Sequence, residues 1–358
     1  MKSHYPLFWP KLKTVDIRKC ENLRYLYSST WAQGHPCLES INIEDCPRLI
    51  QVINVEKNKD GFGLQESVLS DVGNSHQLCN IDAPILNEDC IVVENHEEVF
   101  QVQGGYSFSS IKKLYLTNLF EVRIIWNDFA QVVTLENLTT LKLSDCKKLR
   151  YIFSPTTARS LSHLVDLCIE GCDEIERLIL TKDQVSSSSS NGDTGLQPIS
   201  FPNLTEIAVT NCENLKCLFP FGSVPVLPKL ESLIVKGNSK LEQVFELEDE
   251  VEMATEMEMK FDKLEWLSLE ELPSLIHFSP KEYHFVLSEL VELKVRDCPK
   301  LTTGFFIDSQ KSVHCKTKTP QLVDQDVIEE FATVRNSNFN EDIDWNQWWG
   351  GSQLPHVT

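Results

Sequence analysis

The chain has 358 residues, 41% of them hydrophobic, and 53 acidic against 33 basic side chains give a formal net charge of −20. An acidic surface repels phosphates, so nucleic acid and anionic membrane surfaces are disfavoured as partners. The sequence has no run approaching the ~18 apolar residues of a membrane span, and Met1–Pro10 lacks the apolar segment of a signal peptide. We therefore expect a cytoplasmic protein with twelve reduced cysteines.

Residues 138–149 read L-x-x-L-x-L-x-x-C-x-x-L, the pattern of a leucine-rich repeat with cysteine at its corner. Apolar residues two apart share one face of a strand, so the side chains between them are expected in solvent. The pattern starts nine times, at Leu12, Leu38, Ile111, Leu138, Leu164, Leu204, Leu230, Leu264 and Leu290. We predict an α/β solenoid: a curved leucine-rich-repeat horseshoe with a concave parallel β-sheet and short helices or irregular segments on the convex side.

The corner after each predicted strand is most often a cysteine, and we expect these thiols to be buried in one row. The six corner cysteines are Cys20, Cys46, Cys146, Cys172, Cys212 and Cys298. Asn238 takes the same position in one repeat, and Leu119 and Leu272 take it in two others. On the outer side, residues 156–161 predict a short capped helix.

The repeats assign residues 1–305 to one solenoid, with insertions at 54–107, 181–200 and 246–260. Within the first insertion, Glu97–Val102 resembles Glu242–Leu247 of the seventh repeat, which predicts the back half of an eroded repeat with its strand at Cys90–Val93. The second insertion is serine-rich and the third acidic, and both are expected to be solvated loops. Residues 306–358 are expected to be an acidic, largely irregular tail.

Residue types with catalytic or metal-binding chemistry occur, but not in patterns that form a site. Cys168 and Cys172 near His163 suggest zinc, yet no second pair completes four ligands. No spacing pairs a cysteine with a histidine as a nucleophile, and the acidic insertion lacks the ligand spacing of a calcium loop. We expect no catalytic residue, metal or cofactor, and a protein that is not an enzyme.

The outward strand positions are the candidates for binding, because a solenoid presents them as one continuous sheet. Mixed charge with a few aromatic residues suits a protein partner. The candidate residues are Asp16, Arg18, Glu44, Tyr115, Lys142, Glu170, Lys236, Trp266, Glu270, Lys294 and Arg296.

The returning motif Cys-x-x-Leu-x-x-Leu/Ile-Phe at residues 146–153 and 212–219, with the Phe-Pro-x-Leu start at 201–204, resembles a known family. The resemblance is to the leucine-rich-repeat region of plant intracellular nucleotide-binding leucine-rich-repeat disease resistance proteins of the coiled-coil class, over about residues 8–305. It implies a recognition module of plant innate immunity that senses a pathogen effector or modified host protein, restrains a nucleotide-binding switch, or does both. Its partner would be the effector, a guarded host protein, or the nucleotide-binding domain of a receptor.

The chain has no G-x-x-x-x-G-K-[ST] phosphate loop, so any such switch is expected elsewhere, with this chain a receptor fragment or a truncated relative. The alternative is the substrate-recruiting arm of an F-box-type ubiquitin ligase, which also carries cysteine-corner repeats; only eleven residues precede Leu12 to hold an F-box. An extracellular repeat receptor is disfavoured by the lack of a signal peptide.

Overall fold

A computed structural model describes residues 11–28, 37–49, 51–54, 98–100, 110–126, 135–153, 155–179, 200–220, 227–246, 257–280 and 283–317. The chain divides into two compact units, Met1–Pro320 and Gln321–Thr358. All described residues lie in the first unit.

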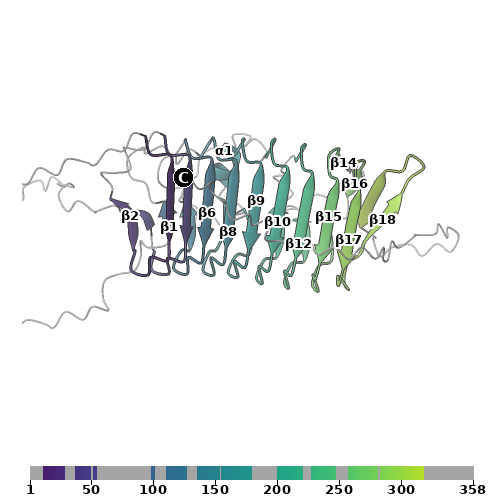
Figure 1. Ribbon diagram of the computed structural model, residues 1–358. Helices are drawn as coiled ribbons and strands as arrows, with labels where there is room; N and C mark the ends of the chain where they lie inside the picture. The colour runs from purple at the N-terminus through teal and green to yellow at the C-terminus, as the bar shows by residue number, and fades with distance from the viewer. Residues whose placement is uncertain are drawn as a thin grey trace, which may run out of the picture. The chain divides into compact units, whose positions relative to one another are not determined.

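The repeats form one parallel sheet of nine strands that follow one another in chain order (Figure 1). Each strand begins two residues after the start of a predicted repeat, so the nine-repeat solenoid is confirmed. The strands are β1 (Thr14–Arg18), β3 (Ser40–Glu44), β6 (Lys113–Thr117), β8 (Thr140–Ser144), β9 (Asp166–Glu170), β10 (Glu206–Thr210), β12 (Ser232–Lys236), β15 (Trp266–Glu270) and β17 (Glu292–Arg296).

The residue that follows each of these strands has a left-handed backbone conformation. The positions are Lys19, Asp45, Asn118, Asp145, Gly171, Asn211, Gly237, Glu271 and Asp297, with φ between 52° and 68°. Each of the first eight donates its N–H to the carbonyl that closes the next strand of the sheet, as Asp145 does to Glu170 at 2.9 Å. We call this series of eight hydrogen bonds the corner ladder. It gives each repeat the same backbone geometry where the chain leaves the sheet. The repeat pattern alone does not predict it.

The corner side chains point inward, and most of them are fully buried. The Cys172 and Cys212 thiols donate to the carbonyls of the last strand residues two positions earlier, at 3.4 Å each. Asn238 links two repeats, because its Nδ2 donates to the Val209 carbonyl at 2.9 Å and its Oδ1 accepts from the Cys212 N–H at 2.8 Å. Leu119 and Leu272 fill the same position as apolar core residues.

The prediction that the corner cysteines and the inward apolar strand residues are all buried is wrong at the two edges of the sheet. Cys20 is exposed and Cys298 is half-buried, in contrast to Cys46 and the three central cysteines. Val15 is half-buried and Val295 is 39% exposed. The reason is that β1 and β17 each have a neighbouring strand on one side only.

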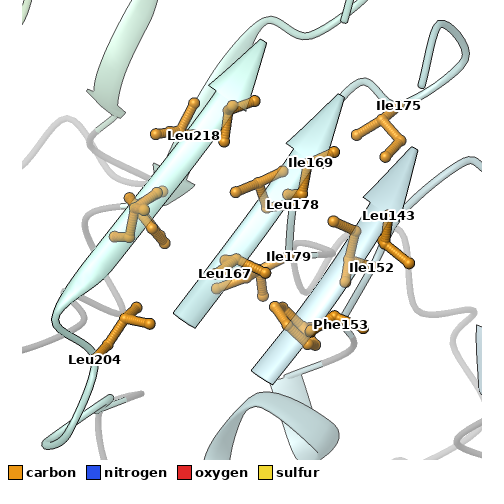
Figure 2. Close-up of a cluster of buried hydrophobic side chains, with 14 of the residues drawn as sticks. Leu143, Ile152, Phe153, Leu167, Ile169, Ile175, Leu178, Ile179, Leu204 and Leu218 are labelled. Carbon is orange, nitrogen blue, oxygen red and sulfur yellow. The ribbon is translucent and has the colours of Figure 1, made fainter. Parts of the chain in front are cut away.

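The core lies between the nine-stranded sheet and the returning segments behind it (Figure 2). Leu143 and Ile169 on the strands face Ile152, Ile175 and Leu178 on the returning segments, and all five are fully buried. Such stacking of one repeat on the next makes the core continuous, because each unit buries its apolar face only against its neighbours.

A second row of short strands, which the sequence does not predict, lies on the returning segments. It comprises β2 (Tyr25–Ser28) with β4 (Gln51–Asn54), β5 (Glu98–Phe100) with β7 (Ile124–Trp126), and β11 (Cys217–Pro220) with β13 (Gln243–Glu246). β5 corresponds to β13 as the resemblance between Glu97–Val102 and Glu242–Leu247 predicts. The strand predicted at Cys90–Val93 lies outside the described residues. Helix α1 (Pro155–Ser160) confirms the predicted short helix.

Segments that precede and follow β15, the strand of the eighth repeat, form a separate four-stranded mixed sheet in the order β14 (Met257–Lys260), β16 (Tyr283–Leu287), β19 (Val313–Thr317) and β18 (Thr303–Ile307). The loop predicted for 246–260 is therefore wrong at its end, where residues 257–260 pair with β16. The β18–β19 hairpin carries regular structure beyond residue 305. Its strand β19 pairs with β16, where Phe285 lies opposite Cys315, and the ring centroid of Phe305 on β18 lies 6.0 Å from that of Phe278. The serine-rich insertion and residues 318–358 lie outside the described residues. Within the described ranges, no helix is long and apolar enough to span a membrane.

Candidate partner-binding surface

The first, third and fifth side chains of the nine strands form three rows on the sheet face opposite the core. We call this surface the open face; it is the concave face of the predicted solenoid. The strands pair residue for residue, so the third positions align across the whole sheet. All eleven predicted binding residues lie in these rows. The third-position row is Asp16, Asn42, Tyr115, Lys142, Cys168, Ala208, Ile234, Ser268 and Lys294.

At the β1–β3 end, an exposed polar network joins three of the predicted residues. Arg18 Nε lies 2.9 Å from Asp16 Oδ1 and 3.4 Å from Glu44 Oε2. Asn42 Nδ2 donates to Asp16 Oδ1 at 3.1 Å. The bond to Asp16 raises the pKa of the Arg18 guanidinium. Exposed pairs of this kind contribute up to about 1 kcal/mol, so a partner can compete with them.

At the β15–β17 end, the predicted residues are engaged with one another. Lys294 Nζ lies 4.6 Å above the Trp266 ring and 3.0 Å from Glu292 Oε1. Glu270 accepts from the Ser268 hydroxyl at 2.6 Å and lies 3.9 Å from Arg296 Nη1. On the adjacent strand β12, Lys236 Nζ instead lies 3.4 Å from Oε1 of Glu271, the left-handed residue that follows β15. Because Lys294 covers the indole ring, Trp266 is a smaller apolar contact surface than the sequence suggests.

Four consecutive third-position side chains are buried, although the sequence predicts them in solvent: Cys168, Ala208 and Ile234 in the middle of the sheet, and Ser268 on β15, which is 3% exposed. Cys168 is 7% exposed, Ala208 4% and Ile234 3%. They occupy adjacent strands in direct register, and we call them the central floor. Burial raises the pKa of the Cys168 thiol to about 12, so this sulfur is protonated and unreactive at neutral pH.

Two half-buried carboxylates flank the central floor. Glu206, at the first position of β10, has a raised pKa because of burial and then the nearby Asp166 charge, with Lys142 opposing the shift. Burial likewise raises the pKa of Glu170, at the fifth position of β9, with Asp145 adding and Lys147 opposing. Sequence reasoning found Glu170 and missed Glu206. The signal that would have found Glu206 is its register beside Asp166, which places two acids side by side in the first row.

Tyr115 and Lys142 lie opposite each other on β6 and β8 and border the central floor on its N-terminal side. Tyr115 is half-buried, and burial followed by the Asp166 charge raises its phenol pKa. Asp166 accepts a hydrogen bond from the Thr140 hydroxyl at 2.9 Å. The positive charge of Lys142 opposes the rise in the pKa of both Cys168 and Glu206, which burial dominates.

The residues of the zinc alternative do not converge. The Cys168 side chain lies on the open face, whereas the Cys172 side chain points inward from the row of corner cysteines. His163 is exposed, with its Nδ1 2.6 Å from the Glu136 carbonyl oxygen. In the part of the chain that the structure describes, no three His, Cys, Asp or Glu side chains are placed to hold a metal ion.

The chain matches the leucine-rich repeats of the plant disease resistance protein RPS2-like family over residues 79–173 and 174–315. Disease resistance protein RGA2 of Solanum bulbocastanum is 26% identical over 134 residues, which cover 37% of this chain and 14% of the relative. A probable disease resistance protein of Arabidopsis thaliana is 28% identical over 204 residues, covering 52% of this chain and 27% of the relative. No solved structure matches at comparable significance.

The matched region spans less than a third of the length of either relative. Both relatives are named for disease resistance, so the F-box alternative gains no support from them.

Proposed function

Since the chain belongs to the leucine-rich-repeat family of RPS2-like plant disease resistance proteins, we propose that it is a non-catalytic recognition module of plant innate immunity that binds protein through its open face. The observation that carries the proposal is the unbroken register of nine strands, which presents three rows of side chains to one partner. Mixed charge over an apolar centre is a surface typical of protein partners.

We place this function in the cytoplasm of the plant cell. The bound protein is a pathogen effector or a host protein that an effector has altered, and the same face restrains a nucleotide-binding switch carried elsewhere. The length of the relatives supports the proposed restraint of a switch, because more than two thirds of each relative lies outside the matched region. That leaves room for a switch domain in a receptor of their kind.

A matched pair of charge-reversed proteins tests the use of the open face. Lys142→Glu with Lys294→Glu changes the third-position row, whereas Lys229→Glu with Lys240→Glu makes the same charge change in exposed turns. Tagged chains capture proteins from extracts of healthy and infected leaves, and the captured proteins are quantified by mass spectrometry. We expect a protein retained by the wild type and the turn variant and reduced at least about tenfold by the open-face variant, a loss of about 1.4 kcal/mol in binding.

Equal capture by both variants would contradict the proposal. The non-catalytic part is tested separately: purified chain should hydrolyse no ATP, and measurable turnover that survives further purification would overturn it.

A further inference from the structure

The centre of the open face combines an apolar floor with carboxylates that lack a cation at contact distance. Cys168, Ala208 and Ile234 form the floor. Among the described residues, neither Glu170 nor Glu206 has an ion pair or a side-chain hydrogen bond. The other acids on this face are ion-paired, as Asp16 is with Arg18 and Glu270 with Arg296, or hydrogen-bonded, as Asp166 is with Thr140. Glu170 and Glu206 are therefore the acids of the described open face that have neither an ion pair nor a side-chain hydrogen bond, and a partner's cation can neutralise them.

The electrostatic state of these carboxylates favours a cationic partner. Burial is the largest cause of the raised pKa of both groups, so each is held in a setting that penalises its charge. A lysine or arginine brought against them from outside relieves that penalty and is drawn by a chain whose net charge is −20. A second copy of this chain has the same negative charge and is repelled.

The spacing of the two carboxylates fixes the shape of the ligand. Glu206 is at the first position of its strand and Glu170 is at the fifth position of the neighbouring one. Four residues of strand separate these positions by about 13 Å along the strand direction. The floor lies midway, at the third position. An extended segment placed along the strands repeats its side chains on one face every second residue, so its positions i, i+2 and i+4 meet one carboxylate, the floor and the other carboxylate.

We propose that the floor of Cys168, Ala208 and Ile234, with Glu170 and Glu206, binds an extended protein segment of the pattern basic-x-apolar-x-basic. The inference deepens the proposed function and rests on it, because it names the chemistry of the partner at the centre of the same face. The apolar side chain of the segment covers the floor, and its two cations lie against the two carboxylates.

A random twelve-residue peptide library displayed on phage tests this inference with the full chain as bait. We expect enrichment of Lys or Arg two residues on either side of Leu, Ile, Val or Phe. A synthetic peptide from the enriched set should then bind wild type and lose at least about tenfold in affinity to Glu170→Gln with Glu206→Gln, measured by fluorescence anisotropy. Its affinity should also fall with added salt, because the attraction is between charges.

The variant and its control are matched in charge. Glu174→Gln with Glu213→Gln removes two carboxylates from exposed corner turns and should leave peptide affinity unchanged. The variant Glu170→Gln with Glu206→Gln should fold at least as well as wild type, because glutamine removes the buried charges. Thermal unfolding measures this. Ile234→Ala keeps both carboxylates and should weaken the preference for an apolar residue at the middle position while leaving the basic preference in place.

Three outcomes would overturn the inference: enrichment of acidic peptides, peptide affinity that the double glutamine variant leaves unchanged, or no enrichment above an unrelated bait. None of them overturns the proposed function, whose own tests are capture from leaf extract by the Lys142 and Lys294 variant and the assay for ATP hydrolysis.

Discussion

The interior of the nine-stranded sheet and its two edge strands carry the same repeat pattern but are not equally buried. Leu141 and Leu233 on interior strands are at most 1% exposed. At equivalent positions, Val15 on β1 is half-buried and Leu293 on β17 is half-buried. The pattern specifies a strand wherever it occurs, whereas complete burial requires a neighbour on both sides. Predictions for this chain therefore come in pairs, one change inside the array and one at its edge.

The largest contrast is expected in thiol reactivity. Cys172 is fully buried within the array, whereas Cys20, at the same repeat position, is exposed. Under native conditions with a small alkylating reagent, Cys20 should react at once and Cys172 should react more than about a thousandfold more slowly, because its labelling requires unfolding. Mass spectrometry of labelled peptides measures both rates. Similar rates for the two cysteines would show that the interior corner row is open to solvent.

Truncation of apolar side chains should show the next largest contrast. Leu141→Ala removes a fully buried side chain next to two flanking strands and should lower the free energy of unfolding by about 2–5 kcal/mol. Val15→Ala, on an edge strand, should lower it by about 1 kcal/mol or less. Urea unfolding followed by circular dichroism compares the two. Equal losses would mean that the edge strand is packed as tightly as the interior.

The corner ladder should be less tolerant inside the array than at its edge. Gly237 has φ +68°, and an added Cβ would clash with Oδ1 of Asn211, the equivalent left-handed residue after β10. Gly237→Ala should therefore cost about 1–3 kcal/mol, measured by the same urea unfolding. Asp297 has a similar φ of 53° at the edge, and Asp297→Gly should change stability by less than about 1 kcal/mol. A neutral Gly237→Ala would show that the corner relaxes freely.

The smallest contrast concerns carboxylates and pH. Burial raises the pKa of Glu206, so its charged form is disfavoured in the folded chain. Glu206→Gln should slightly raise thermal stability at neutral pH, and this gain should shrink as pH falls through the raised pKa, where the acid becomes protonated. Glu44→Gln, on β3 beside the edge strand β1, should slightly lower stability by removing the 3.4 Å pair with Arg18 of that edge strand. A gain from Glu206→Gln that persists in acid would point to a cause other than charge.

Much of the fold follows from local sequence, because a period of two and a recurring corner act within a single repeat. That is why nine strand positions, the returning apolar residues and the helix after Phe153 could be predicted. The β18–β19 hairpin could not, since its strands carry no repeat pattern and pair through contacts such as Thr303 Oγ1 to Thr317 Oγ1 at 2.9 Å.

The candidate site was less accessible to prediction than the fold. Position within the repeat placed Lys142 and Trp266 on the open face, but it did not show that Cys168 and Ile234 are buried there, because burial depends on neighbours from other repeats. Glu206 was missed for a related reason. Its significance comes from Asp166 and Glu231, whose charges reach it across strand pairings that are distant in sequence.

The corner ladder also bears on how such a chain can diversify. Its bonds persist where neighbouring repeats are far apart in sequence: Asp45 N lies 3.1 Å from the Thr117 carbonyl, and Gly171 N lies 2.9 Å from that of Thr210. Equivalent positions across these two steps are 73 and 40 residues apart, against 26 between the repeats of β10 and β12. A gene encoding this protein can therefore gain or lose codons between repeats without shifting the recognition rows. The segments that connect the strands can therefore change in length while selection acts on single residues of the open face.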